Sequence, residues 1–167
     1  MVANFEGYLA NGYRGKWLSY PIGASSIAEV ANQENVDDSE LSVSYIKVND
    51  REYRLAKGFN GVSISEFNEA GEMLQLVPDV FVKHLSEFLE KCIFYDVAEF
   101  IKSWSEYHYF YPDLTSYWDI GNNCVLMRLK DSVISKFVDR EALGREIANG
   151  LMTEDGYFSA IPIDKIY

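Results

Sequence analysis

The sequence has few residues of the kinds that build metal centres, disulfide frameworks or membrane spans. It holds two cysteines, Cys92 and Cys124, and two histidines, His84 and His108. No pair of these has a chelating spacing, so we expect no metal site, and the isolated cysteines predict reduced core thiols in a cytoplasmic protein. No apolar run reaches the roughly 18 residues of a membrane span. The first residues also lack the basic start and apolar stretch of a signal peptide.

Basic residues are scarce relative to acidic ones. There are 15 Lys and Arg against 26 Asp and Glu, which gives a net charge of −11 and a pI of about 4.6. A chain with this balance is poorly suited to neutralise DNA phosphates, so we expect no direct nucleic-acid binding. Acidity also keeps many proteins soluble, so the net charge alone identifies no function.

Signatures of catalysis are equally scarce. The P-loop, GxGxxG, GxSxG and HExxH patterns are all missing from the sequence. Carboxylate pairs are so common that no glycosidase-like pair can be singled out. Helix capping and surface ion pairing account for the charged residues of 139–146 without an active site. We therefore expect a protein that is not an enzyme and that uses no cofactor.

The first third of the chain shows mixed strand and helix patterns. Residues 8–22 predict two strands around a glycine-containing turn, and residues 25–33 predict a short helix with Ser26 and Glu29 in capping-box spacing. Residues 41–55 predict a hairpin that turns at Asn49 and Asp50. The glycines and asparagine of residues 57–61 mark a boundary.

The middle of the chain has helical periodicity. Ser63 and Glu66 form a capping box, and an apolar stripe of Phe67, Ala70, Leu74 and Val77 follows them. Residues 79–92 and 95–104 predict two further amphipathic helices. Together these segments predict a small bundle.

The last third is again mixed. Residues 123–130 and 156–161 predict strands, and a short helix between them begins at Asp139 as its N-cap and ends at Gly150. Glu141 and Arg145 have the spacing of a stabilising ion pair on that helix. We predict an α+β fold, an elongated chain of three small domains that comprise residues 1–61, 62–103 and 104–167.

The acidic residues of the middle segment follow helical spacing. Carboxylates three positions apart on a helix advance about 4.5 Å, and phosphates of one DNA strand advance about 3.4 Å. Rows of carboxylates can thus approximate a phosphate track, although an ordinary solvated helix face is the alternative. The residues expected on this DNA-mimic surface are Glu66, Glu69, Glu72, Glu87, Glu90, Asp96 and Glu99, with lesser weight on Asp139, Glu141, Glu146, Glu154 and Asp155.

Aromatic residues are concentrated in residues 104–118. Consecutive aromatic side chains cannot all face one core, and Tyr and Trp are favoured at protein interfaces, so interface and core are both open. We predict a homodimer that forms through this segment. The residues concerned are Trp104, Tyr107, Tyr109, Phe110, Tyr111, Tyr117 and Trp118.

The stretch FVDREALGREI, residues 137–147, resembles the [Y/F]-[I/V]-D-x-x-A-[Y/L]-G-R-[D/E] segment of ArdA-type antirestriction proteins. Two further segments resemble that family in the same order. YLANGYRGKWLSYPI, residues 8–22, resembles its opening strand–turn–strand, and VSISEFNEAGEML, residues 62–74, resembles its S-[I/L]-x-E-[L/I]-N segment. The chain is less acidic than many members of the family.

The resemblance implies a cytoplasmic, dimeric inhibitor carried by phage or mobile elements. Such proteins imitate bent duplex DNA and occupy the specificity and methyltransferase subunits of type I restriction–modification enzymes. Two other functions stay open. The acidic surface could act on another nucleic-acid enzyme such as a CRISPR nuclease, or the chain could be a small enzyme or intracellular binding module, which an apolar pocket with convergent titratable groups would favour.

Overall fold

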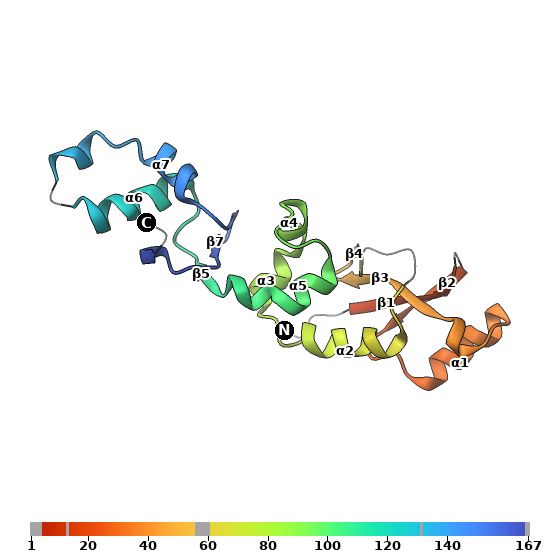
Figure 1. Cartoon of the computed structure of the whole chain (residues 1–167). Coiled ribbons are helices and arrows are strands. Elements are labelled where there is room, and N and C mark those ends of the chain that lie inside the picture. The colour runs from red at the N-terminus through yellow and green to blue at the C-terminus, as the bar shows by residue number, and fades with distance from the viewer. Residues whose placement is uncertain (1–4, 13, 56–60, 131, 166–167) are drawn as a thin grey trace. The chain divides into compact units, whose positions relative to one another are not determined.

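The chain forms two compact units, residues 1–104 and 105–167 (Figure 1). The computed structural model describes residues 5–12, 14–55, 61–130 and 132–165. Each unit contains helices and a small sheet, so the expected α+β class is confirmed. A boundary was expected within residues 57–61. Of these five residues the structure describes only Gly61, so the expected boundary lies almost entirely outside the described residues.

The first unit is built on a four-stranded antiparallel sheet with the order β2-β1-β3-β4. The two hairpins predicted from the sequence are confirmed. Asn49 and Asp50 turn the second hairpin with φ angles of 48° and 64°, a left-handed conformation that these two residue types tolerate. The strands are β1 (Phe5–Asn11), β2 (Arg14–Ser19), β3 (Ser42–Val48) and β4 (Arg51–Arg54).

Helix α1 (Ala24–Glu34) follows β2, as expected, but it begins differently. Its N-cap is Gly23, which makes no side-chain capping bond, so the capping box predicted for Ser26 and Glu29 is wrong. Glu29 instead accepts a hydrogen bond of 2.7 Å from Lys16 on β2. The pairing with Lys16 fixes the Glu29 side chain across the helix–sheet contact. A short 3₁₀ turn, η1 (Asp38–Glu40), leads into β3.

Helix α2 (Ile64–Leu74) carries the capping box that the sequence predicted. The Ser63 hydroxyl accepts from the Glu66 amide, and the Ser63 amide donates to the Glu66 carboxylate at 2.8 Å. The buried face of α2 lies directly on the first sheet. A side-chain carbon at Gly7 of β1 would lie 2.7 Å from the Phe67 ring. The three-domain arrangement is therefore not confirmed, because α2 packs on the sheet that precedes it.

The rest of the first unit is helical, with α3 (Asp79–Lys83), α4 (Leu85–Glu90) and α5 (Val97–Ser103). The single helix predicted over 79–92 is interrupted at the buried His84, whose φ and ψ are −97° and 16°. Phe88 is fully buried and packs against Phe81 and Phe100, each at a ring distance of 5.9 Å. Cys92 is exposed, so it is not the core thiol that we expected, whereas Cys124 is buried.

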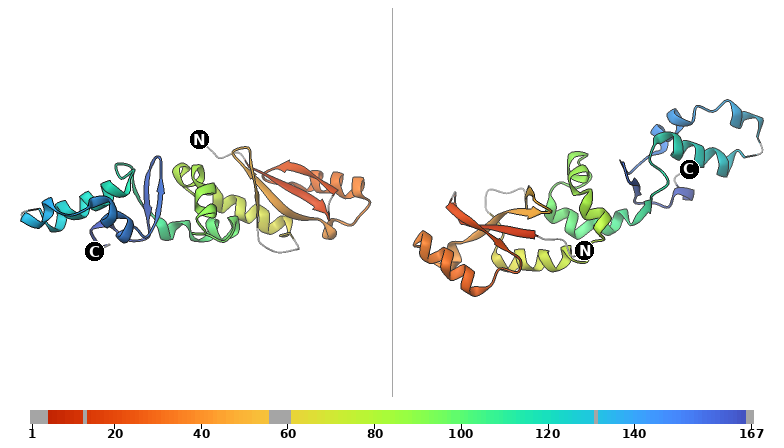
Figure 2. Two further views of the ribbon diagram at one scale, coloured as in Figure 1. Left: turned by 90° about the horizontal axis from the view of Figure 1, so that it is seen from above. Right: turned by 180° about the vertical axis from the view of Figure 1, so that it is seen from behind.

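The second unit combines a three-stranded antiparallel sheet, of order β5-β7-β6, with two helices that lie side by side (Figure 2). The strand predicted over 123–130 is wrong, because most of this segment belongs to helix α6. Ser116 caps that helix by accepting from the Asp119 amide. The elements are β5 (Tyr109–Tyr111), α6 (Tyr117–Arg128), α7 (Arg140–Ile147), β6 (Leu151–Thr153) and β7 (Gly156–Ser159), with 3₁₀ turns η2 (Trp104–Tyr107) at the junction of the units, η3 (Val133–Lys136) and η4 (Ile163–Lys165).

Helices α6 and α7 meet at two glycines. A side-chain carbon at Gly121 would lie 1.8 Å from the Arg140 carbonyl oxygen, and one at Gly144 would lie 1.7 Å from that of Tyr117. The two helix backbones are therefore in direct contact, and this contact explains the glycine inside residues 137–147. Helix α7 starts at the predicted N-cap Asp139 but ends at Ile147, so Gly150 is not its terminator.

Candidate functional site: an acidic surface and an adjoining pocket

None of the twelve predicted DNA-mimic carboxylates is buried. Nine are exposed, and Glu87, Asp96 and Asp155 are partly buried. Seven of the twelve lie in the first unit and five in the second. Each unit therefore presents acidic side chains to solvent, as a surface that binds basic groups requires.

Several of these carboxylates are engaged within their own helices. Glu66 closes the capping box of α2, Asp96 accepts from the Glu99 amide at the start of α5, and Asp139 accepts from the Ala142 amide at the start of α7. Glu99 accepts a short hydrogen bond from the Tyr95 amide. These four carboxylates therefore contribute to helix ends and offer only part of their hydrogen-bonding capacity to a partner.

Two more carboxylates pair with basic side chains. Glu87 lies 3.2 Å from the buried His84 ring, and Glu141 lies 2.7 Å from Arg145, the ion pair that the sequence predicted. Four of the twelve make no hydrogen bond or ion pair with any residue that the structure describes. We call them the free carboxylates: Glu69, Glu72, Glu90 and Glu146.

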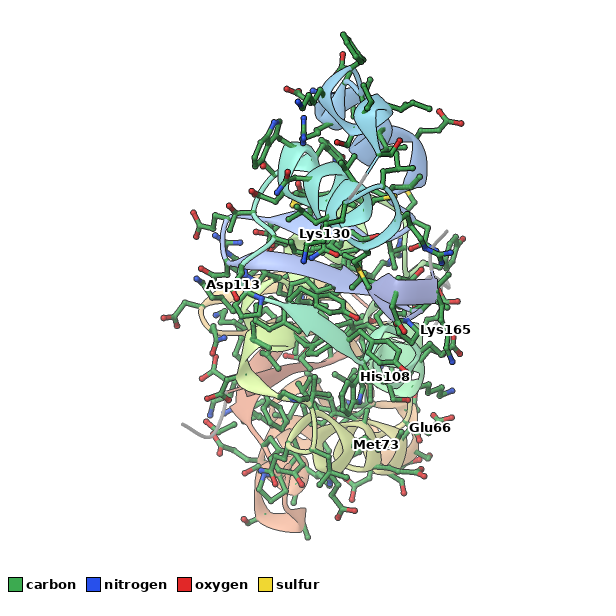
Figure 3. All side chains as sticks on the ribbon, turned by 90° about the vertical axis from the view of Figure 1, so that its left-hand side faces the viewer. Glu66, Met73, His108, Asp113, Lys130 and Lys165 are labelled. Atoms are coloured by element: carbon green, nitrogen blue, oxygen red, sulfur yellow. The ribbon has the colours of Figure 1, made fainter. Side chains whose placement is uncertain are left out.

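Glu66 and Glu69 border a pocket in the first unit. Its volume is about 230 Å³, and it lies between one stripe of α2 and one stripe of α5. Figure 3 labels Glu66 and Met73, which lie two turns apart on α2. Glu72 is not among the lining residues. The lining consists of Leu55, Val62, Glu66, Glu69, Ala70, Met73, Ala98, Ile101 and Lys102.

The charges at the pocket are of both signs. Hydrogen bonds from the backbone and the hydroxyl of Ser63 hold the pKa of Glu66 below its ordinary value of 4.5, and the positive charge of Lys102 lowers it further. Glu66 is therefore ionised at neutral pH, with Lys102 close enough to offset part of its charge. The three lining charges leave a net negative rim, in which Glu69 is the free carboxylate.

The aromatic residues of 104–118 are mostly packed, with Trp104 in the first unit and the other six in the second. Trp104 contacts Phe81 at a ring distance of 5.3 Å, and Phe110 contacts Phe158 at 4.6 Å. Six of the seven aromatic residues are partly buried. Trp118 is 49% exposed and is the member best placed to contact another molecule. The homodimer stays a prediction.

The second unit contains an apolar segment that is open to solvent and that the sequence patterns did not reveal. Its side chains are between 50% and 82% exposed, and Phe137 has the largest value. The misassigned strand at 123–130 included two of its members, Leu126 and Met127, and a strand would have buried one of these two neighbouring side chains. We call it the 126–137 apolar segment, comprising Leu126, Met127, Val133, Ile134 and Phe137.

Two further observations concern the described part of the chain. Within it, no three His, Cys, Asp or Glu side chains are placed to share a metal ion. No helix there has both the length and the apolar character to cross a bilayer.

In comparisons with known proteins, no family model and no curated protein sequence matches this chain.

Proposed function

We propose that this chain is a non-enzymatic, cytoplasmic antirestriction protein that imitates duplex DNA. It occupies the DNA-binding groove of a type I restriction–modification enzyme, formed by the specificity and methyltransferase subunits, and so excludes DNA. The resemblance of residues 8–22, 62–74 and 137–147 to ArdA-type proteins supports the choice of target. The observation that carries the proposal is the exposure of all three glutamates of α2, Glu66, Glu69 and Glu72, at a helical spacing of three.

The attraction between the chain and its target is electrostatic. A groove that binds DNA presents Lys and Arg side chains to phosphates, and exposed carboxylates can replace those phosphates. The helical segment 62–103 is well suited to this role because it holds eight acidic and three basic residues. Since each carboxylate replaces one phosphate contact, the free energy of binding is distributed over many residues.

The free carboxylates are the most informative residues for a test. Replacing Glu69, Glu72, Glu90 and Glu146 together by Gln removes four charges without breaking a hydrogen bond among the described residues. We expect this variant to lose inhibition of DNA cleavage by a type I enzyme. If each contact contributes about 0.5–1 kcal/mol, four of them correspond to a loss of roughly thirtyfold or more in affinity.

A matched control separates position from net charge. Four exposed carboxylates outside the predicted surface are replaced by their amides in the variants Asp38→Asn, Asp50→Asn, Glu106→Gln and Asp113→Asn. We expect this variant to inhibit nearly as well as the wild type. If both variants lost inhibition equally, the net charge of the chain would determine inhibition, and the positions of the carboxylates would not matter. Inhibition of a CRISPR nuclease, with type I enzymes unaffected, would assign the acidic surface to that other target.

The pocket between α2 and α5 favours a second candidate, a small-ligand binding module. An apolar cavity with convergent titratable groups is the usual form of such a site. Its volume of about 230 Å³ is below the roughly 300–1,000 Å³ of sites for drug-sized ligands, so a ligand held there would be small. Specific binding of a small metabolite, with no displacement of DNA from any restriction enzyme, would support this alternative.

A further inference from the structure

The pocket between α2 and α5 adjoins the carboxylates of the proposed DNA-mimic surface. We infer that it receives one arginine side chain from the DNA-binding groove of the target enzyme. This inference rests on the proposed function, and it adds a specific anchoring contact to a surface that otherwise acts through many exposed charges.

The size and the floor of the pocket fit a single long side chain. A cavity of about 230 Å³ is too small for most drug-sized ligands but can admit the stem and head of one residue. Six of the nine lining residues are apolar, and a methylene stem is stabilised against such surfaces. Met73 lies on the wall, and its flexible thioether adapts to the shape of an inserted group.

The charges of the pocket favour a cation at its rim. Glu66 is already engaged by Ser63 and compensated in part by Lys102. Glu69 has no partner among the described residues, so both of its oxygens are available to a new donor. An anionic ligand would meet two carboxylates against one ammonium group, which disfavours it.

A guanidinium group suits this rim better than an ammonium group. Its planar donors can make two parallel hydrogen bonds to the Glu69 carboxylate, with a defined geometry. It is also more weakly hydrated than an ammonium group, so less free energy is lost when it enters a partly apolar pocket.

The arginine contact in the pocket contributes to affinity in a different way from the surrounding exposed carboxylates. Exposed charges act mainly through screened attraction and contribute steeply salt-dependent affinity. A side chain buried in a pocket near the centre of an interface is a typical hot spot, where one truncation changes affinity by more than a surface contact does. Filling the pocket should therefore weaken binding with little change in salt dependence.

The first test fills the pocket without changing any charge. Ala70→Leu places a larger side chain on the lining stripe of α2, and Leu is a good helix former. We expect its affinity for a type I methyltransferase to fall by about tenfold or more. The control, Ala142→Leu, changes an exposed alanine of α7 and should bind like the wild type. Wild-type affinity of a correctly folded Ala70→Leu variant would overturn the inference.

The second test needs no restriction enzyme. The intact chain is titrated with N-acetyl-arginine amide by NMR, and the uncharged N-acetyl-citrulline amide serves as the control ligand. We expect saturable shifts of the Ala70, Met73 and Ile101 signals with the arginine compound alone, lost in Glu69→Gln. No shifts, or equal shifts with both ligands, would overturn the inference. If arginine binds but the wild type displaces no DNA from the methyltransferase, the proposed function fails and the occupant is not a residue of that enzyme.

Discussion

Gly121 of α6 and Gly144 of α7 face each other at the point where the two helices touch. A side-chain carbon at Gly144 would lie 3.1 Å from the Gly121 amide nitrogen and 1.7 Å from the Tyr117 carbonyl oxygen. We therefore expect Gly144→Ala to force the helices apart and to destabilise the second unit by about 1–3 kcal/mol. Thermal or urea unfolding measures this loss.

The control for this prediction is Glu146→Ala, on the same helix but exposed and without a partner among the described residues. Its effect should stay within about 0.5 kcal/mol. If Gly144→Ala were as stable as the wild type, the close contact between α6 and α7 would be wrong.

Tyr157 is the buried polar centre of the second unit. It is fully buried among Leu114, Ile120 and Ile163, and its hydroxyl donates to the Asn149 side chain and accepts from the Asn149 amide at 2.9 Å. Tyr157→Phe removes both bonds and leaves that amide without its acceptor. We expect a loss of about 1 kcal/mol in the free energy of unfolding.

The same hydroxyl gives a dependence on alkaline pH. Burial raises the pKa of Tyr157, so the folded state holds this proton more tightly than the unfolded chain does. The protonated Tyr157 hydroxyl contributes to the free energy of unfolding, and this contribution is fully present below the pKa of the unfolded chain, about 10. It is lost as the pH rises through the higher pKa of the folded state. The difference in the free energy of unfolding between the wild type and Tyr157→Phe should therefore shrink at high pH.

Ser63 stabilises the start of α2, where the acidic row begins. Ser63→Ala removes the acceptor of the Glu66 amide and should cost about 1 kcal/mol. The bonds from Ser63 lower the pKa of Glu66 in the folded chain below its ordinary value of 4.5. The stability that these bonds contribute is therefore present above pH 4.5 and is lost as the pH falls through the lower pKa of the folded chain. The loss measured by urea unfolding should thus be larger at pH 7 than in acid. The neighbouring Ser65→Ala, also exposed on α2, should be nearly neutral at both.

Trp118 tests the predicted homodimer. Because it is 49% exposed while the other aromatic residues of 104–118 are partly packed, Trp118→Ala should weaken the dimer most. Light scattering at micromolar concentration measures the change in mass, and Leu76→Ala, an exposed residue of the first unit, should leave it unaltered. A monomeric wild type would refute the dimer. A dimer that survives Trp118→Ala but dissociates with Phe137→Asp would lie at the 126–137 apolar segment instead.

Local signals in the sequence were sufficient for much of the fold. The hairpin at Asn49 and Asp50 and the caps at Ser63 and Asp139 depend on residues a few positions apart, and each is confirmed. Errors arose where nearby residues leave two conformations open. The short apolar run at 123–130 suits a strand or a buried helix, and the cap at Ser116 with the contact at Gly121 selects the helix.

The candidate site depended more on tertiary structure. The spacing of Glu66, Glu69 and Glu72 was visible in the sequence, and so was the exposure expected of them. The pocket was not, because it exists only where α2 packs against α5 and brings Lys102 close to Glu66. In the same way, Gly144 lies within the quoted stretch of residues 137–147, but only the fold shows that Gly121 is its contact partner.

The most direct measurement of the proposed function is displacement of labelled duplex DNA from a purified type I methyltransferase by the wild-type chain. We predict full displacement at stoichiometric concentrations and an affinity for the enzyme that falls steeply with added salt, since several carboxylates replace phosphates at once. Failure to displace DNA, or binding to the enzyme that does not respond to salt, would contradict the DNA-mimic account.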